Sequence, residues 1–265
     1  MKQRAVVVLP PLLCGAAFLA LWELFVVTRH IKPFLLPKPS AIWGQFHGNF
    51  HLVRSSTRVT GTNALIGLLL GVAAGVVVAL AASRFRILRE LISPLATSVA
   101  AIPIIVLVAI FNNLFSITSE VPRRLMVALV VFFIVFLNVA KGLEQTDPTH
   151  VELLHSYGAT NADIIRKVRI PNALAYLFVA LRQAAPLAVV TAFVSEYFGG
   201  TQNGLGARIT QSIASSRDAA GWAYVLAACL LGLAFFVLAI AIEHITTPWR
   251  ARQANEFSSI PTTRR

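Results

Sequence analysis

Residues 147–171 read DPTHVELLHSYGATNADIIRKVRIP, a polar and basic segment set between long apolar blocks. Asp147 suits the N-cap of a helix whose first helical position is Pro148. Thr149 and Glu152 offer an alternative capping box slightly further along. Gly158 fits the left-handed residue that ends such a helix, so one short helix is predicted here.

A second helix is predicted to begin directly after this glycine. Thr160 and Asp163 form another capping box. Pro171 is expected to end the second helix, because a proline disfavours helical angles at the residue before it, here Ile170. The segment is therefore predicted to be a rigid elbow of two helices hinged at Gly158, which a membrane protein would present to a soluble partner.

The composition is that of a membrane protein. Hydrophobic residues make up 57% of the chain and charged residues 13%, whereas a soluble domain carries about 25% charged residues. The net charge is +12, but the basic residues stand mainly at the ends of apolar blocks, where anionic lipid headgroups explain them better than nucleic acid does. Cys14 and Cys229 are too few for a disulfide framework or metal site, and both are expected to be buried.

Six membrane spans are predicted from blocks of about 20 apolar residues, the length that crosses a hydrocarbon core of roughly 30 Å. They cover residues 8–28, 60–83, 91–112, 124–143, 174–198 and 221–243. Lys2 and Arg4 precede the first block, but no clear cleavage signal follows it, so a retained span is expected. Pro94 and Pro103 indicate a bent third span, either lining a path or bent for packing.

The distribution of Lys and Arg predicts the orientation. If the N-terminus lies in the cytoplasm, the segments on the cytoplasmic side hold more Lys and Arg than the segments on the opposite side. Both termini and the elbow are therefore expected in the cytoplasm. The chain is expected to divide into a first span with an outer amphipathic segment (1–56), a core that contains the elbow (57–247) and a cytoplasmic tail (248–265).

Two further patterns lie near the second span. Residues 40–56 carry an apolar stripe with a Trp, which indicates a short amphipathic helix in the outer membrane interface. Gly67, Gly71 and Gly75 place small residues on one helix face. That face could pack closely within the same subunit or against a second one.

No constellation of catalytic residues is visible, so an enzyme is not expected. Gly204-Leu205-Gly206 lacks the Lys-Ser/Thr of a phosphate loop. ATP and Mg, if used, would be bound by a separate chain. The notable charged residues within spans are Glu23, Arg182 and Glu196, and each is either a pathway residue or a charge at an interface or helix end. Arg182 could also snorkel to the cytoplasmic face. Candidates for lining a translocation path are Thr191, Ser195, Glu196, Asn112 and Gln183.

The spacing within the elbow resembles the EAA loop of ABC importer permeases. In that pattern a Glu-Ala-Ala is followed four residues later by glycine, and then by Ile-x-Leu-Pro. Here the corresponding residues are Glu152-Leu153-Leu154, Gly158 and Val168-Arg169-Ile170-Pro171. The two leucines depart from the two alanines, and they add bulk to a packing helix. The resemblance implies that an ATPase is met by Glu152, Leu153, Leu154, Gly158, Ala159, Ile164, Val168, Ile170 and Pro171.

Two further motifs resemble the nitrate, sulfonate, taurine and pyrimidine-precursor group of these permeases. Phe34-Leu35-Leu36-Pro37-Lys38-Pro39-Ser40 resembles its Leu-Pro-x-Pro-Ser entry, and Glu196 with Gly204-Leu205-Gly206 and Ile209 resembles its Ala-Glu…Gly-Leu-Gly-x-x-Ile ending. Phe111-Asn112-Asn113-Leu114-Phe115 departs from the Trp-Phe-Gly-type turn that this group usually has after the third span.

The resemblance implies an all-α integral membrane protein with six transmembrane helices of the type I ABC importer permease fold, in a bacterial cytoplasmic membrane. It implies a second permease copy in a homodimer, two cytoplasmic ABC ATPases and an extracytoplasmic substrate-binding protein. It also implies transport by alternating access, of nitrate, a sulfonate such as taurine, a pyrimidine precursor or a flavin. The competing class is a stand-alone secondary transporter or channel, which would need ion-coupling carboxylates deep in the membrane.

Overall fold

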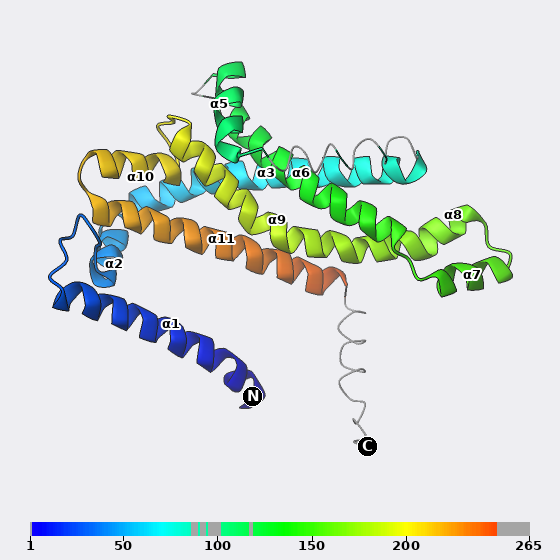
Figure 1. Ribbon diagram of the computed structural model, residues 1–265, viewed down its shortest axis with the longest axis horizontal. Helices are drawn as coiled ribbons and strands as arrows, with labels where there is room; N and C mark the ends of the chain where they lie inside the picture. The colour runs from blue at the N-terminus through cyan, green and yellow to red at the C-terminus, as the bar shows by residue number, and fades with distance from the viewer. Residues whose placement is uncertain (1, 86–89, 91–93, 95–101, 117–118, 248–265) are drawn as a thin grey trace.

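The computed structural model describes residues 2–85, 90, 94, 102–116 and 119–247, and these residues form helices without a strand (Figure 1). The helices form a long bundle with one end built from α2 and α10 and the other extended by α7 and α8 (Figure 1). Their bounds are α1 Lys2–Thr28, α2 Pro39–Gly48, α3 Phe50–Arg84, α5 Ile104–Leu114, α6 Val121–Glu144, α7 Pro148–Ser156, α8 Asn161–Ile164, the π-helical turn η1 Ile165–Arg169, α9 Ile170–Phe198, α10 Leu205–Ala214 and α11 Asp218–Thr246.

Five segments of the described chain are long and apolar enough to cross a membrane. They are Leu9–Thr28, Phe50–Arg84, Val121–Glu144, Asn161–Phe198 and Asp218–Thr246. Each overlaps one of the predicted spans. The remaining predicted span, 91–112, lies partly outside the described residues, and its described end is α5, which begins directly after Pro103. The predicted tail, 248–265, lies outside them entirely.

The interface between α3 and α6 forms much of the core. Gly67, Gly71 and Gly75 of α3 lie directly against Val127, Val131 and Val135 of α6. A side chain at any of these glycines would overlap the valine opposite it. The glycine face is therefore used for close packing within one subunit, which decides between the two uses that the sequence left open.

The predicted amphipathic helix at 40–56 is wrong in its extent. Helix α2 ends at Gly48, Asn49 caps it, and α3 begins at Phe50. The Asn49 amide donates to the backbone oxygen of Gln45 at 3.2 Å and to its side-chain oxygen at 2.9 Å. This local bonding competes with continuation of the helix. The chain turns there, and Val53 then packs into a second core cluster with α10 and α11.

Helix α1 lies along the outside of the bundle and meets it at the α2 end (Figure 1). The Glu23 carboxylate accepts hydrogen bonds from Ser40, from its backbone N–H at 3.0 Å and its hydroxyl at 2.7 Å. Glu23 therefore caps the start of α2, because its carboxylate accepts from an amide in the first turn that has no partner within its own helix. Trp22 adds an edge contact with Trp222 of α11.

The prediction that both cysteines are buried is wrong. Cys14 lies exposed on α1 and Cys229 lies exposed on α11. An apolar helix face in a membrane protein packs against lipid as readily as against protein, so an apolar run does not place its cysteine inside the core.

Candidate functional site: the helical elbow and the joint around Glu196

Helix α7 begins and ends as the sequence predicts. The Asp147 carboxylate accepts a hydrogen bond from the Thr149 backbone N–H at 2.9 Å, and this bond holds the pKa of Asp147 below its usual value. The chain leaves α7 through Gly158, whose φ is +74°. The N–H groups of Gly158 and Ala159 donate to the carbonyls of His155 and Leu154 at 2.9 and 3.0 Å. These two hydrogen bonds together are the pattern of a Schellman cap.

The second helix of the elbow also starts at its predicted cap. The Thr160 hydroxyl accepts from the Asp163 backbone N–H at 3.3 Å, and the Asp163 carboxylate accepts from the Thr160 backbone N–H at 3.1 Å. The two residues satisfy each other's backbone donors, as a capping box does. The turn between α7 and α8 is therefore fixed at both ends by local bonds.

The prediction that Pro171 ends this helix is wrong. Ile170 has helical angles, φ −65° and ψ −48°, and the chain continues as helix into α9. The five residues before it, Ile165–Arg169, form a π-helical turn, in which the N–H of Ile170 donates to the carbonyl of Ile165. The wider turn accommodates a proline that lacks an N–H donor and would crowd a normal α-turn.

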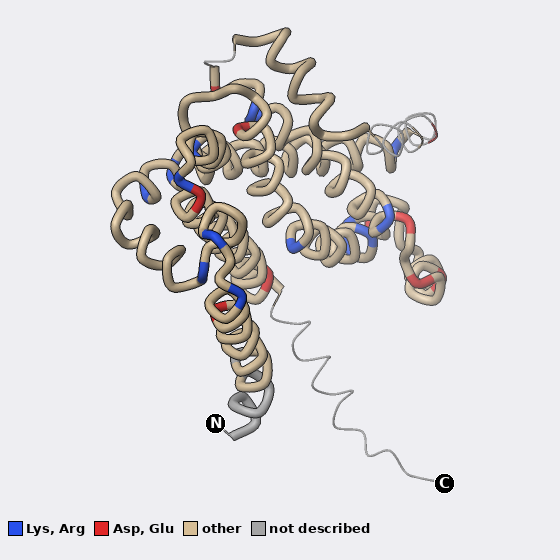
Figure 2. Tube along the Cα trace, turned by 60° about the vertical axis from the view of Figure 1, so that its left-hand side comes forward, with Lys and Arg blue, Asp and Glu red and all other residues tan. Residues whose placement is uncertain are grey.

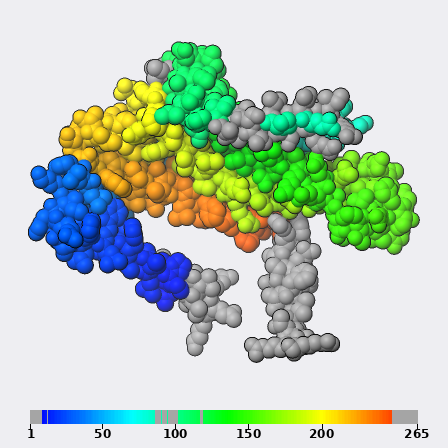
Figure 3. Space-filling model, in the orientation of Figure 1, coloured from blue at the N-terminus to red at the C-terminus, as the bar shows by residue number. Residues whose placement is uncertain are grey.

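The elbow projects beyond the end of the bundle, as the space-filling view shows (Figure 3). Glu152, Leu153, Gly158, Ile170 and Pro171 are exposed there, and Ile164 is buried. Leu154, Ala159 and Val168 are half-buried. A groove of about 660 Å³ lies between α7 and the start of α9, with Leu153, Leu154 and Val168 among its walls. Four of the nine predicted coupling residues, Leu153, Leu154, Val168 and Pro171, thus line one groove of the elbow.

Asn172 anchors the elbow to the bundle, and the sequence reasoning missed it. Its amide donates to the carbonyls of Gly142 and Gln145 at 2.7 and 2.8 Å. These carbonyls lie at the end of α6, where they have no partner within their own helix. Its position directly after Pro171 was the available signal. The elbow is therefore joined to α6 as well as to α9.

At the opposite end, Glu196 of α9 lies in a buried polar joint with α3 and α10. Its Oε2 accepts from the Thr60 hydroxyl at 2.7 Å and from the Gly206 backbone N–H at 3.1 Å. The Thr60 hydroxyl in turn accepts from the Leu205 N–H at 2.9 Å. The Glu196 side chain is 1% exposed. Its carboxylate caps the first turn of α10 from another helix, where a negative charge complements the helix dipole.

Glycine is required at two positions of this joint. Gly204 has φ +106° and ψ 171°, a backbone region that is essentially restricted to glycine. A side chain there would also overlap the Glu196 carboxylate, and one at Gly206 would overlap backbone atoms of α9. The Glu…Gly-Leu-Gly spacing of the sequence therefore has a physical explanation: each glycine lets α10 approach the carboxylate that caps it.

A second polar cluster lies between α3 and α6, and its members were not predicted as a group. Asn63 donates to Glu120 Oε2 at 2.5 Å and accepts from Arg124 Nε at 3.0 Å. Arg123, only 3% exposed, forms an ion pair with Glu120 at 2.6 Å. Asn63 follows Thr60 by three residues, so the two face the same way on α3. That spacing was the signal available in the sequence.

The remaining path candidates are divided between two places. Thr191 and Ser195 are buried one turn apart on α9, on a different side of the helix from Glu196, and the Ser195 hydroxyl donates to Met126 Sδ of α6 at 3.4 Å. Asn112 of α5 donates to the Gly199 carbonyl at 3.3 Å, just beyond the end of α9. Gln183 is exposed about three and a half turns before Glu196. Four of the five candidates therefore gather near the end of α9 farthest from the elbow, and Gln183 lies apart.

Arg182 is paired with a carboxylate of a neighbouring helix. Its Nε and Nη2 donate to the Glu243 carboxylate of α11 at 2.5 and 2.6 Å. Glu243 is buried, while Arg182 is exposed on one side. This bidentate ion pair joins α11 to α9, and it explains why both charged residues are tolerated within their spans.

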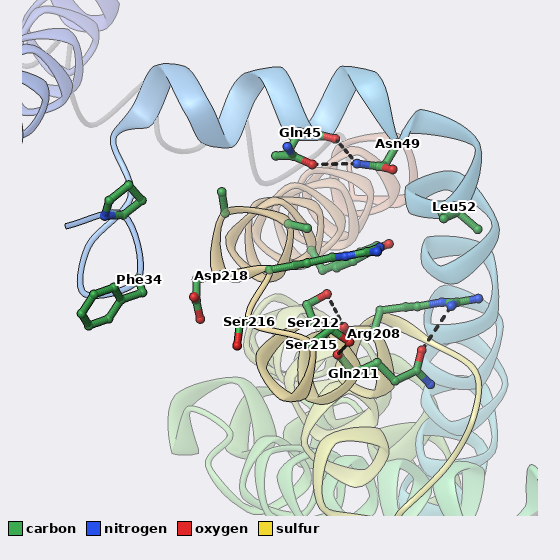
Figure 4. A pocket seen from close by; sticks show the side chains of 15 residues that line it. Phe34, Gln45, Asn49, Leu52, Arg208, Gln211, Ser212, Ser215, Ser216 and Asp218 are labelled. Atoms are coloured by element: carbon green, nitrogen blue, oxygen red, sulfur yellow. Dashed lines mark hydrogen bonds between the residues drawn. The ribbon is translucent and has the colours of Figure 1, made fainter.

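A cavity of about 740 Å³, here called the outer cavity because it lies at the end of the bundle farthest from the elbow, opens between α2, α10 and the start of α11 (Figure 4). Polar groups stand on both sides of it: Arg208 donates to Gln211 at 3.1 Å on one side, and Asn49 donates to Gln45 on the other. Ser212, Ser215 and Asp218 add further polar groups, while Phe34, Leu52 and Tyr224 are among its apolar lining residues. The cavity offers hydrogen-bonding groups of both kinds at the end of the bundle farthest from the elbow.

Comparison with known proteins identifies the class of membrane protein. Residues 67–251 match the family described as "Binding-protein-dependent transport system inner membrane component". This match covers most of the chain, so the chain belongs to that family of multi-pass membrane permeases.

Individual relatives agree with this assignment. The chain is 30% identical to "Formylaminopyrimidine transport permease protein ThiX" of Halalkalibacterium halodurans over 259 residues, 95% of this chain and 100% of that one. It is 27% identical over 198 residues to a "Probable ABC transporter permease protein" of Haemophilus influenzae, which covers 75% of this chain and 80% of that one.

Two solved structures share the fold. A chain of an amino acid ABC transporter, crystallised with histidines, superposes with a TM-score of 0.58 at 18% identity, covering 78% of this chain and 96% of that one. A chain of the inward-facing MetNI methionine ABC transporter gives 0.50 at 19% identity, covering 73% and 95%. The type I importer permease fold expected from the sequence is confirmed.

Proposed function

We propose that this chain is the transmembrane subunit of an ATP-driven importer for a pyrimidine precursor. The observation that carries the proposal is the elbow, two locally capped helices that project beyond the bundle and are anchored to α6 by Asn172. Its exposed surface and groove suit a soluble partner. The partners we infer are two cytoplasmic ATPases, which bind ATP and Mg, a second permease copy in a homodimer and an extracytoplasmic substrate-binding protein.

The inferred mechanism is alternating access. Closure of the ATPases on ATP would push the elbow, and the continuous helix from Asn161 to Phe198 would carry that movement across the membrane. Thr191, Ser195 and Glu196 lie at the far end of this helix, close to Asn112. We infer that this end and the exposed Gln183 border the path, and that the binding protein meets the end with the outer cavity.

A pyrimidine precursor is favoured over the other solutes of the group because of the relative named as a formylaminopyrimidine permease. The test is uptake of radiolabelled formylaminopyrimidine by proteoliposomes that hold the chain with an ABC ATPase and a substrate-binding protein from the same organism. ATP-dependent uptake is expected, with nitrate, taurine and riboflavin as competitors that have no effect. Uptake of one of those competitors instead would overturn the choice of solute and leave the importer class intact.

The elbow is tested by Gly158→Val, since a β-branched residue is strongly disfavoured at φ +74°. Gly44→Val is a matched control, because this glycine lies in α2 with open space around it. Glu152→Lys reverses the charge on the exposed face of α7. Both elbow variants should lose ATPase co-purification or coupled transport, while Gly44→Val retains them. Full transport and normal complex recovery in both elbow variants would refute docking at the elbow.

The orientation is tested by cysteine labelling in a background without Cys14 and Cys229. A cysteine at His155 or Ser258 should react only from the cytoplasmic side. Labelling from the outside alone would overturn the topology. A secondary transporter or channel would instead give uptake that needs no ATPase, so the same proteoliposomes without the ATPase discriminate between the two classes.

A further inference from the structure

A second groove, of about 730 Å³, lies between the first turns of α3 and the middle of α11. It is separate from the outer cavity, since the two share no lining residue. Its walls are Phe46, Phe50, His51, Val53, Arg54, Ser55, Thr57, Arg58, Ala227, Leu230, Leu231 and Ala234. Neither the elbow nor the joint around Glu196 uses it.

One wall of the groove is cationic. His51, Arg54 and Arg58 stand three and four residues apart along α3, so they share one helix face. All three are exposed, and no Asp or Glu lines the groove. In the part of the chain that the structure describes, neither arginine forms an ion pair with a carboxylate. Two adjacent guanidinium groups without a counter-charge form a site for an anion.

The opposite wall is apolar. Ala227, Leu230, Leu231 and Ala234 present one face of α11, and Leu230 is 46% exposed. At Gly61 the two helices touch, because a side chain there would meet Leu231 at 3.4 Å. The groove therefore borders a direct contact between α3 and α11. Its α3 wall carries the cations and its α11 wall is hydrocarbon.

The depth of the groove in the membrane follows from its neighbours. Arg58 lies two residues before residue 60, where the apolar span of the sequence begins. Trp43 of α2 is 55% exposed and stacks on Phe46, one of the groove walls. Exposed tryptophans are typical of the headgroup level of a bilayer. These neighbours favour a position of the arginines near the level of lipid phosphates, with the apolar wall facing acyl chains.

We propose that this groove binds an anionic glycerophospholipid, whose phosphate lies between Arg54 and Arg58 and whose acyl chain runs along α11 toward Ala234. A zwitterionic lipid would place its own cation near the two arginines, so selectivity for net negative headgroups is expected. A soluble phosphate would match only the cationic wall and leave the apolar wall open. An acidic protein segment would do the same, and a lipid matches both walls. The site depends only on the chain being in a membrane, whatever solute it transports.

The experiment is native mass spectrometry of the purified chain, titrated with phosphatidylglycerol or phosphatidylcholine. The double variant Arg54→Gln/Arg58→Gln should bind phosphatidylglycerol roughly 30-fold more weakly, from about fivefold for each cation lost near the phosphates. Arg29→Gln/Arg84→Gln removes the same charge from exposed positions outside the groove and should bind as the wild type does. Ala234→Phe fills the apolar end without changing the charge and should also weaken binding.

Each result supports or overturns the site. Loss of phosphatidylglycerol in the double variant and in Ala234→Phe, with retention in the control, supports the site. Equal loss in the Arg29/Arg84 control would show a general charge effect, and equal binding of phosphatidylcholine would exclude headgroup selection. Competition by millimolar inorganic phosphate would indicate a free anion site instead of a lipid site. Helical circular dichroism and elution volume check that Ala234→Phe is folded, and unchanged lipid binding in that folded variant would refute the acyl-chain position.

Discussion

The Thr60 hydroxyl donates to Glu196 Oε2 at 2.7 Å, and the two residues are 136 positions apart in the chain. The same hydroxyl accepts from the Leu205 backbone N–H, so a single oxygen connects α3, α9 and α10. All atoms of this joint are buried. Removing the hydroxyl would leave the buried Leu205 N–H unsatisfied and would take one of the two hydrogen bonds from Glu196 Oε2, which is costlier than losing a surface hydrogen bond.

We therefore expect Thr60→Val to lower the free energy of unfolding by about 1–3 kcal/mol, the cost of leaving buried polar groups unpaired. Thr62→Val is the matched control, because Thr62 lies two residues along α3 on an exposed face. Its effect should stay within about 0.5 kcal/mol. Unfolding in mixed SDS micelles, followed by circular dichroism, measures both. Equal stabilities of the two variants would contradict a structural role for the joint.

Gly204→Ala should be more disruptive than Gly200→Ala. Both glycines have positive φ, +106° and +65°, but only at Gly204 would a side chain also overlap the Glu196 carboxylate. Alanine tolerates the left-handed region at Gly200 for about 1–2 kcal/mol. The conformation at Gly204 is nearly restricted to glycine. Thermal unfolding in detergent should rank wild type above Gly200→Ala, and Gly200→Ala above Gly204→Ala; the reverse order of the two variants would be incompatible with this geometry.

Gly71→Ala should destabilise the α3–α6 interface by about 1–3 kcal/mol through overpacking. Its new methyl group would meet the Ala128 carbonyl at 2.6 Å and the Val131 Cβ at 2.7 Å. Gly232→Ala in α11 is the control, since nothing lies within 4 Å of its new methyl group. The control should be neutral or slightly stabilising, because alanine is the better helix former. Melting temperatures of the two purified variants test this, and a stable Gly71→Ala protein would mean that the helices move apart at little cost.

The Arg182–Glu243 pair should show a strong energetic coupling. Arg182→Met leaves the buried Glu243 carboxylate without its two-pronged partner, so this single variant should be less stable than Arg182→Met/Glu243→Leu, in which both charges are gone. A double-mutant cycle on unfolding free energies isolates the pair. A coupling energy near zero would show that the two charges interact no more strongly than two charges exposed to water.

The sequence by itself determined the local features of this protein. The caps at Asp147 and Thr160 and the left-handed stop at Gly158 involve residues two to five positions apart, so their chemistry can be read directly from the order of residues. The apolar blocks likewise fixed the membrane class and the approximate spans. Each of these features depends on the chain near it and not on where other helices lie.

Tertiary structure alone decided the contacts between distant helices. The sequence offered Glu196, Gly204 and Gly206 as a motif, but only the fold brings Thr60 to that carboxylate. It also pairs Arg182 with Glu243 and places both cysteines on outer faces. At Pro171 the local rule was overruled, because a π-helical turn relieves the crowding that would otherwise end the helix. In a bilayer, lipid and protein are equally apolar neighbours, so hydrophobicity tells which residues are in the membrane and packing geometry decides which of them meet.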